Sequence, residues 1–357
     1  SEVLSVDITP DGEYIVAGTN GGKVYLFDKD SSTPLATWSH SSETITSVSI
    51  SADGDNIVSN SYYSSGSTYF GYIRLYSPSV ENQLWKYSVW GKGYDAEISA
   101  DGKYIVGTSG NSAQGNDDGT IHLLENVPDC TSQACKVWSY EIGDDVLTAS
   151  ISANGEYIIA GSKDNKAYFF DKDSSTPQWT ATLSGEVISS SISADGEYVT
   201  LGTDSNKVYL FDKDSSTSLW SYSAASDENP DVLSVSISAD AKYIVSGNED
   251  NKAYLFKNTL IARPSVIPYA PRDDSEVETP VLRWFAGSDD RSNLTFDIYL
   301  DTSSSPTTLI ADDITALSYT PSGLVKNTKY YWKVVATDPS GSKTSSVMNF
   351  TYKISVG

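Results

Sequence analysis

The chain has 357 residues, enough for two or three domains, and carries 47 acidic against 24 basic side chains. The net charge of −23 excludes a nucleic-acid surface as a default and leaves no polybasic patch for a membrane. No apolar run approaches the ~20 residues that a membrane span needs. We therefore expect neither a nucleic-acid partner nor a membrane span. Ser1 in place of an initiator methionine indicates a processed or trimmed start.

A unit of short predicted strands recurs along residues 1–260. Each copy has an alternating strand such as Val232–Ile237, a tight turn, a second strand such as Tyr243–Ser246 and a third such as Lys252–Phe256. The turns recur every 41 to 53 residues, at Pro10–Gly12, Ala52–Gly54, Ala100–Gly102, Ala153–Gly155, Ala194–Gly196 and Ala239–Ala241. This spacing predicts an all-β fold of four-stranded propeller blades, six in number.

A tryptophan marks the predicted outermost strand of five copies: Trp38, Trp85, Trp138, Trp179 and Trp220. A tryptophan on an edge strand covers the neighbouring blade and keeps the edge from pairing with other chains. The repeats resemble the WD-repeat and quinoprotein-like β-propellers, especially the serine-rich versions on archaeal and bacterial surface proteins. They differ from true WD repeats because the third strands end in Phe-Asp or Leu-Tyr, and because the Gly-His pair is absent.

The sixth copy is incomplete, since neither the polar turn nor a tryptophan strand follows Phe256. Either Thr259–Arg263 forms a short fourth strand, which is the alternative we favour, or a segment of another subunit takes this place. The second alternative would make the protein a building block, because an open strand edge is a template for strand addition.

Two copies carry insertions between their second and third strands, on adjacent blades and the same face. One insertion, Asn60–Phe70, is rich in tyrosine, and the other, Gly110–Asp118, is rich in Asn and Asp. Insertions on one face of a repeat protein often build its binding surface, although drift in tolerant hairpin loops is the alternative. The candidate binding residues are Tyr62, Tyr63, Tyr69, Phe70, Asn116, Asp117 and Asp118.

The repeat ends near Pro264, and about seven short strands then predict an immunoglobulin-like sandwich. Trp284, Leu324 and Tyr330 resemble the early tryptophan and the tyrosine corner of a fibronectin type III domain. We therefore expect a propeller over residues 1–263 and a fibronectin type III-like sandwich over 264–357. Such domains are usually spacers or adhesion modules. Asn293 and Asn349 begin N-glycosylation sequons in this segment.

Cys130 and Cys135 are the two cysteines of the chain, and four residues separate them in a predicted hairpin loop. This spacing suits a local disulfide, which contributes ~2 kcal/mol by the loop-entropy argument and favours an oxidising, extracellular setting. A metal or redox pair is the alternative, but only His122 lies near enough in sequence to complete such a site.

Three turns read Asp-Lys-Asp-Ser-Ser-Thr and offer oxygen ligands of the kind that calcium takes. Their carboxylates are Asp28, Asp30, Asp171, Asp173, Asp212 and Asp214. No acidic residue follows at the distance of a closing bidentate ligand. We therefore interpret them as hairpin turns, and we predict no cofactor other than a weakly suggested calcium ion.

Asp7 and Glu97 occupy equivalent innermost-strand positions, where the other copies have serine. Two carboxylates facing a channel could form an acid/base pair or a cation site, but we interpret them as solvated channel residues. His40 and His122 are isolated, and the sequence has no nucleophile elbow, phosphate loop or haem motif. We expect no enzymatic activity and no catalytic residues.

Together these features predict a secreted or cell-surface protein with a structural or adhesive role. It would act through contacts with other protein subunits in a surface layer or an extracellular filament. The alternative is a module that binds glycans or peptides on the insertion face, and a third hypothesis is a propeller hydrolase or lyase that uses Asp7 and Glu97.

Overall fold

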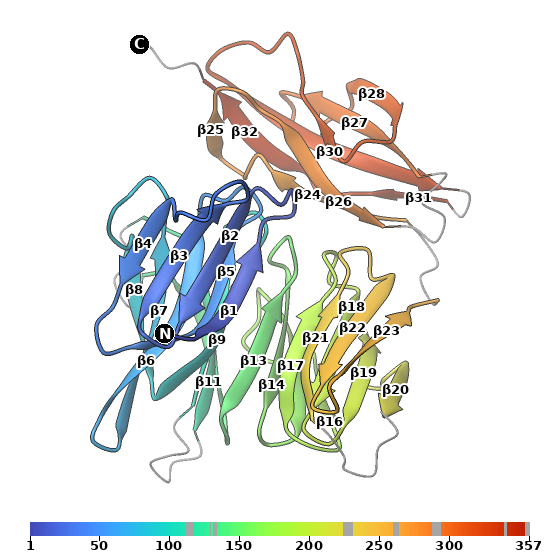
Figure 1. Ribbon diagram of the computed structural model, residues 1–357. Helices are drawn as coiled ribbons and strands as arrows, with labels where there is room; N and C mark the ends of the chain where they lie inside the picture. The colour runs from blue at the N-terminus through green and yellow to red at the C-terminus, as the bar shows by residue number, and fades with distance from the viewer. Residues whose placement is uncertain are drawn as a thin grey trace. The chain divides into compact units, whose positions relative to one another are not determined.

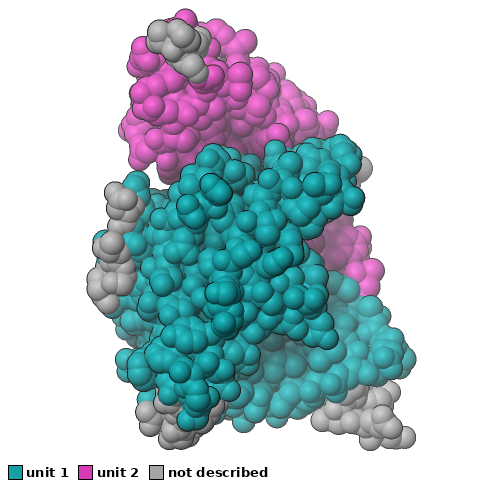
Figure 2. Space-filling view, turned by 60° about the vertical axis from the view of Figure 1, so that its left-hand side comes forward, with its two compact units in different colours: residues 1–192, 196–236, 245–254 teal, residues 193–195, 237–244, 255–357 magenta. Residues whose placement is uncertain are grey.

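The computed structural model describes residues 1–110, 118–128, 130, 134–223, 231–259, 264–287, 294–338 and 341–353. All the regular elements in these ranges are strands, and the same ranges contain no helix that could cross a membrane. Figure 2 colours the two compact units of the chain, residues 1–192, 196–236 and 245–254 in one and residues 193–195, 237–244 and 255–357 in the other. The predicted boundary at residue 263 stays a prediction.

Five four-stranded antiparallel sheets follow one another along the chain, and a three-stranded sheet comes next (Figure 1). We number them sheets 1 to 6. Sheet 1 contains β1 (Val3–Ile8), β2 (Tyr14–Thr19), β3 (Lys23–Asp28) and β4 (Ala36–Ser39), and sheet 2 contains β5 (Thr44–Ile50), β6 (Ile57–Ser65), β7 (Thr68–Tyr76) and β8 (Trp85–Trp90). Sheet 3 contains β9 (Lys92–Ile98), β10 (Tyr104–Gly110), β11 (Gly119–Glu125) and β12 (Lys136–Ile142).

Sheet 4 contains β13 (Val146–Ile151), β14 (Tyr157–Ser162), β15 (Lys166–Asp171) and β16 (Trp179–Thr182). Sheet 5 contains β17 (Val187–Ile192), β18 (Tyr198–Thr203), β19 (Lys207–Asp212) and β20 (Trp220–Ser223), and sheet 6 contains β21 (Val232–Ile237), β22 (Tyr243–Asn248) and β23 (Lys252–Lys257). Each strand pairs with the next one along the chain. This repetition of small antiparallel sheets is the architecture of a β-propeller, so the prediction of an all-β propeller fold is confirmed.

One side-chain arrangement builds the turn between the first two strands of each sheet. In sheet 4, the Ser152 hydroxyl donates to the Asn154 side chain at 2.8 Å and accepts the Tyr157 N–H at 3.0 Å. The Asn154 oxygen in turn accepts the Glu156 N–H at 3.1 Å. Short polar side chains satisfy turn backbone in this way. The same Ser-to-Asp contact recurs in sheets 2, 3, 5 and 6, which explains why the turn motif repeats.

Neighbouring sheets pack through glycines that leave room for the side chains of the next sheet. A Cβ added at Gly18, Gly161 or Gly202 would meet Ile45, Val187 or Val232 at 2.7, 2.4 or 2.7 Å. Turn glycines lie as closely against tyrosine rings of the preceding sheet: Gly54 against Tyr14, Gly155 against Tyr104 and Gly196 against Tyr157. Only glycine permits so close an approach at these positions.

The tryptophans lie on the outermost strands as predicted, and three of them also bond to the next sheet. The indole N–H groups of Trp38, Trp138 and Trp179 donate to backbone carbonyls of Val80, Lys172 and Lys213 at 3.4, 2.7 and 2.7 Å. Trp179 also stacks on Phe211, with ring centroids 5.5 Å apart. The predicted fourth strand of sheet 6, Thr259–Arg263, lies outside the described residues apart from Thr259.

The C-terminal segment forms two further sheets, one of β24 (Ser265–Ala270), β26 (Leu282–Gly287) and β29 (Ser318–Tyr319). The other contains β25 (Ser275–Val277), β27 (Thr295–Asp301), β28 (Leu309–Ile314), β30 (Thr328–Asp338), β31 (Gly341–Thr344) and β32 (Met348–Tyr352). One apolar cluster around the fully buried Trp284 and Trp332 joins the sheets. The Tyr330 hydroxyl accepts the Val325 N–H at 2.9 Å and so fastens the loop before β30.

Candidate functional site

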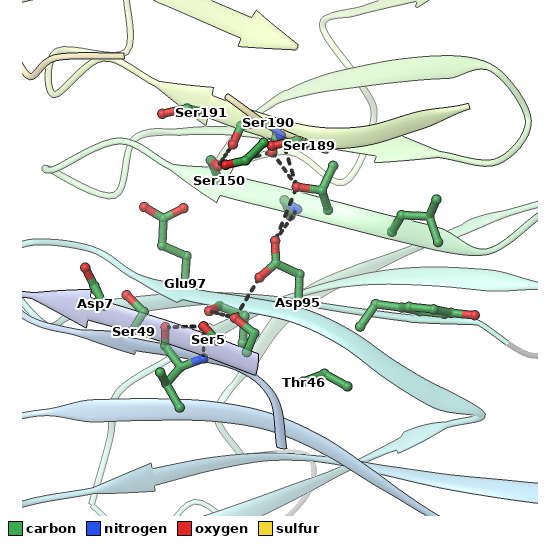
Figure 3. Close-up of a pocket in the computed structure, with 18 of the residues that line it drawn as sticks. Ser5, Asp7, Thr46, Ser49, Asp95, Glu97, Ser150, Ser189, Ser190 and Ser191 are labelled. Atoms are coloured by element: carbon green, nitrogen blue, oxygen red, sulfur yellow. Dashed lines mark hydrogen bonds between the residues drawn. The ribbon is translucent and has the colours of Figure 1, made fainter. Parts of the chain in front are cut away.

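A polar cavity of about 540 Å³ lies among the first strands of sheets 1 to 6 (Figure 3). The side chains that line it come from β1, β5, β9, β13, β17 and β21, and many of them are serines. The structure places the two predicted carboxylates, Asp7 and Glu97, in the lining of this cavity. It adds a third carboxylate, Asp95 from β9. This cavity is the place where catalysis or ligand binding in the channel would have to occur.

Asp7 bonds to the neighbouring sheet instead of standing free in water. One of its carboxylate oxygens accepts the N–H of Ile50 in β5 at 2.9 Å, and the other accepts the N–H of Ile8 at 2.8 Å. Desolvation raises the pKa of this carboxyl above its ordinary value, and the hydrogen bonds from Ile50 and Ile8 oppose that rise.

Asp95 joins two sheets that flank its own. It accepts the Ser47 hydroxyl from sheet 2 at 2.8 Å, and it accepts the Ala149 N–H and the Thr148 hydroxyl from sheet 4 at 3.1 and 3.3 Å. Burial raises the pKa of Asp95, and these donors act against that rise. Asp95 was not predicted from the sequence. Its place two residues before Glu97 in an alternating strand puts both side chains on one face, and this was the signal that could have found it.

Glu97 accepts the N–H of Ile151 in β13 at 3.3 Å. Desolvation raises its pKa to about 8, and the nearby Asp95 and Asp7 carboxylates contribute to the rise. Asp7 and Glu97 both line the cavity and are partly exposed, and each also receives a backbone N–H of another sheet, so their interpretation as solvated channel residues stays a prediction. A buried N–H otherwise left without an acceptor would cost free energy.

Hydroxyl groups continue the same pattern around the cavity. Ser5, Ser49, Thr148 and Ser189 accept the N–H groups of Val48, Ile98, Ser190 and Val235 at 3.1, 3.4, 3.1 and 2.9 Å. Each acceptor lies on the first strand of one sheet and each donor on the first strand of the next. The serines of the channel therefore hold consecutive sheets together, and none of the described residues that line the cavity carries a cationic side chain to orient an anionic substrate.

The tyrosine-rich insertion lengthens two strands rather than forming a loop. β6 and β7 each have nine residues and pair in register from Ile57 and Tyr76 to Ser65 and Thr68. We call residues 61–72 the aromatic hairpin; it extends beyond the rest of sheet 2 at the lower left of Figure 1. The predicted rings are therefore held by a paired strand backbone.

One face of the aromatic hairpin carries a row of rings. Tyr63 lies opposite Phe70, and Phe70 lies opposite Trp90 of β8. Tyr63 stacks on Phe70 and Tyr72, with ring centroids 5.0 and 6.0 Å apart. Trp90 is 64% exposed and is a second residue that sequence reasoning missed, because the end of β8 becomes an exposed extension only beside the lengthened β7.

The opposite face carries Tyr62 and Tyr69, in edge contact with centroids 5.6 Å apart. Neighbouring residues of a strand point to opposite faces, so the four predicted aromatic residues belong to two surfaces. Lys92 lies over the Tyr62 and Tyr94 rings, at 5.0 and 4.8 Å from their centroids. Of the other predicted binding residues, Asp118 is exposed, while Asn116 and Asp117 lie outside the described residues.

A buried ion pair fixes the base of the aromatic hairpin. Both terminal nitrogens of Arg74 donate to the Glu43 carboxylate at 2.7 Å, and Nη1 also donates to the Ser61 hydroxyl. Arg74 is 3% exposed, and the Tyr72 ring lies 4.7 Å from its guanidinium carbon. Paired forks of this kind fix geometry strongly, so the row of rings starts from a rigid base.

The remaining predicted positions have structural partners. A disulfide joins Cys130 and Cys135, whose Cα atoms are 5.2 Å apart. In the three polar turns, Asp28, Asp171 and Asp212 accept the N–H two residues later, and Asp30, Asp173 and Asp214 pair with the lysine before them. The described ranges contain no cluster of three His, Cys, Asp or Glu side chains that could hold a metal ion.

The two predicted glycosylation positions differ in what the structure describes. Asn293 lies outside the described residues. Asn349 lies in β32, where its side-chain nitrogen donates to Asp273 at 3.0 Å and its oxygen accepts the Asp274 N–H at 2.9 Å. A glycan on Asn349 would replace the first of these contacts.

Comparison with known proteins agrees with the repeated sheets. The family described as outer membrane protein assembly factor BamB matches residues 70–259, which is more than half of the chain. The family described as WD domain, G-beta repeat matches residues 1–28. No curated protein gives a match. The predicted likeness to quinoprotein-like and WD-repeat propellers is confirmed at the level of the propeller.

Proposed function

Since the chain belongs to the family of outer membrane protein assembly factor BamB, we propose that it is a non-enzymatic structural or adhesion protein that acts through protein–protein contacts. We propose further that sheets 1 to 6 are six blades, that the C-terminal segment is a fibronectin type III-like sandwich, and that the protein is extracellular, in a surface layer or a filament of an archaeal or bacterial cell. The Tyr330 to Val325 hydrogen bond supports the sandwich, since it has the form of a tyrosine corner.

The observation that carries the proposal is the row of rings Tyr63, Phe70 and Trp90 on the aromatic hairpin. Aromatic side chains are enriched at protein interfaces because they bury a large area and lose little rotamer freedom. The row is held by paired strands and by the Arg74 to Glu43 ion pair, so little further ordering is needed on binding. The channel carboxylates, in contrast, are engaged in holding the sheets together.

The test compares the two faces of the aromatic hairpin. We expect the full chain to self-associate or to bind its surface partners, as seen by light scattering and electron microscopy, and a Tyr63→Ala/Trp90→Ala variant to lose these contacts. Tyr62→Ala/Tyr69→Ala, on the opposite face of the same hairpin, is the matched control and should behave as the wild type. Equal behaviour of wild type and both variants would contradict the role of this row.

A second candidate function uses the same row to bind glycans. Tyr63 and Phe70 are partly exposed and nearly parallel, with 16° between their ring planes, and aromatic rings stack on sugar faces. A carbohydrate array distinguishes the two: binding that disappears in Tyr63→Ala/Trp90→Ala would favour the glycan, and an array without binding would remove it.

A further inference from the structure

The aromatic hairpin differs from the rest of the chain in its charge. In the whole chain 20% of the residues are charged, but residues 56–73 contain no charged side chain. The hairpin continues β6 and β7 beyond the end of their neighbour β5, which pairs with β6 only as far as Tyr62. An acidic protein therefore has an uncharged, aromatic extension at one end of its repeated sheets (Figure 1).

A lysine lies beside the row of rings on this hairpin. Lys86 of β8 is exposed, and its ammonium nitrogen lies 4.5 Å from the centroid of the Tyr72 ring. It lies on the same face of sheet 2 as Trp90, because side chains four residues apart in a strand point the same way. Among the described residues Lys86 has no carboxylate in contact, whereas the buried Arg74 is neutralised by Glu43. The row is thus flanked by one cation that a carboxylate of a partner can meet.

A pair of positions recurs beside the turn between the second and third strands. One residue precedes the first strand of a sheet and the other follows the second strand, and the N–H of the latter donates to the carbonyl of the former. In sheet 4 these residues are Asp145 and Lys163, which form an ion pair at 2.9 Å. In sheet 1 they are Glu2 and Asn20, joined by a side-chain hydrogen bond of 3.1 Å. The acidic member is compensated in both sheets.

In sheets 5 and 6 both members of this pair are acidic. Glu186 lies beside Asp204, and Asp231 lies beside Glu249, with the same backbone hydrogen bond in each case. Desolvation raises the pKa of Glu186, and the Asp204 carboxylate raises it further; desolvation and Glu249 do the same to the pKa of Asp231. None of the four carboxylates makes a hydrogen bond or an ion pair with another described residue. We call these four residues the acidic pairs.

The aromatic hairpin and the acidic pairs lie at the same end of the repeated sheets. The hairpin is built on the turn between the second and third strands of sheet 2, and Asp204 and Glu249 begin the same turn in sheets 5 and 6. Each sheet repeats the same antiparallel order, so these turns share one end. All of these residues belong to the same compact unit. One end of the sheets therefore carries both a cation beside aromatic rings and an uncompensated set of carboxylates.

We propose that this end binds the same end of a second copy of the chain, with the row of one copy against the acidic pairs of the other and Lys86 beside their carboxylates. The inference rests on the proposed role of the row and names its partner. Each copy supplies one hairpin and one set of acidic pairs, so a two-fold arrangement satisfies both contacts at once. Such an arrangement is closed and gives a dimer, which would be the unit of any larger assembly.

The net charge of −23 does not prevent this contact. At physiological ionic strength the Debye length is about 8 Å, so more distant charges are largely screened and the charges at the contact decide. Two acidic copies meet the least local repulsion at the uncharged hairpin. Aromatic anchors supply most of the binding free energy in many interfaces, and matched charges set the register and exclude wrong partners.

The test reverses each charge in the full chain and then combines the reversals. At physiological ionic strength, sedimentation velocity and light scattering should show the wild type doubling in mass with concentration and growing no further. Lys86→Glu, and separately Asp204→Lys/Glu249→Lys, should each weaken the dimer about tenfold or more, because like charges then meet at both contacts. An equimolar mixture of the two variants should regain the affinity of the wild type, since opposite charges meet again at both contacts.

Lys103→Glu is the matched control for the charge reversal. Lys103 is exposed, and its ammonium nitrogen lies 5.1 Å from the centroid of the Tyr104 ring, as in the arrangement of Lys86 and Tyr72. It follows the turn between the first two strands of sheet 3, at the other end of the sheets, so this variant should dimerise as the wild type does. A monomeric wild type, normal dimerisation of Lys86→Glu, or a mixture without recovery would each overturn the proposal.

A further variant separates this inference from the proposed function. Tyr63→Ala/Trp90→Ala should also lose the dimer. If it loses association while Lys86→Glu keeps it, the row still mediates contacts and the acidic pairs are not its partner. If the wild type stays monomeric but binds other surface proteins through the row, the proposed function stands and the second copy is excluded.

Discussion

The C-terminal segment and the repeated sheets bury their apolar side chains in different ways. Among the described residues, β24 to β30 and β32 share one cluster built around Trp284 and Trp332. The repeated sheets have four smaller clusters, and each is shared by two neighbouring sheets, such as sheets 1 and 2 or sheets 4 and 5. A core side chain of the C-terminal segment therefore supports both of its sheets, whereas a core side chain of the repeats supports mainly one contact between neighbouring sheets.

The largest effect should come from the single core. Trp332 is fully buried, and Trp332→Ala should cost ~3–5 kcal/mol of the free energy of unfolding because it removes apolar contacts and leaves a cavity. Trp179→Ala, at a half-buried tryptophan of sheet 4, is the matched change in the repeats. Thermal unfolding followed by calorimetry should show Trp332→Ala lowering a transition of the C-terminal segment while the propeller transition keeps its temperature. A common shift of all transitions would show that the segments unfold together.

A second pair of variants compares a filled glycine position with an empty one. Gly161→Val should destabilise the protein by ~1–3 kcal/mol, since the new side chain overlaps Val187 and overpacking of this size forces the sheets apart. Gly247→Val meets open space in the monomer and should leave the denaturant midpoint of the monomer nearly unchanged. Equal losses at the two positions would mean that sheet 6 is covered in the monomer.

The repeat and its turns could be predicted from the sequence because they are local. Ser152, Asn154 and Tyr157 make their contacts within six residues, so the motif that builds the turn is visible in the sequence. The tryptophans of the outermost strands could be placed because one recurs in each of the first five copies, after the third strand of the repeat.

What the sequence could not predict depends on contacts between sheets. Val6 and Val48 look alike in their strands, but Val6 is 66% exposed, whereas Val48 packs in the cluster that sheets 1 and 2 share and is 4% exposed. The sequence could not show that Asp7 and Glu97 accept backbone N–H groups, because the donors Ile50 and Ile151 lie 43 and 54 residues further along the chain. Trp90 gave no local signal, because its exposure depends on the length of β6 and β7.

The channel carboxylates make the stability of the repeats depend on pH. Glu97 has a pKa of about 8 in the folded protein against 4.5 in the unfolded chain. Between these values the unfolded chain releases a proton that the folded protein keeps, so the free energy of unfolding falls as pH rises and levels off above 8. Glu97→Gln should remove this loss. Its free energy of unfolding should exceed that of the wild type by ~1–2 kcal/mol at pH 9, a value reduced by the screening of channel water, and should equal it at pH 4. Urea unfolding of both proteins at pH 4, 7 and 9 measures the difference. A difference in the free energy of unfolding that is the same at all three pH values would contradict the prediction.

The smallest effect should come from loops that one hydroxyl fastens. Tyr330→Phe keeps the ring among its apolar neighbours and removes the acceptor of the Val325 N–H, so we expect a loss of ~1 kcal/mol in the free energy of unfolding. Ser152→Ala is the counterpart in the repeats, where one hydroxyl makes two contacts in a turn. Because the C-terminal segment has one core, Tyr330→Phe should lower the unfolding transition of that whole segment. Ser152→Ala should instead raise amide hydrogen exchange mainly around β13 and β14. Local exchange in both variants would show that the loop before β30 opens independently of the core, and would weaken the contrast between the two segments.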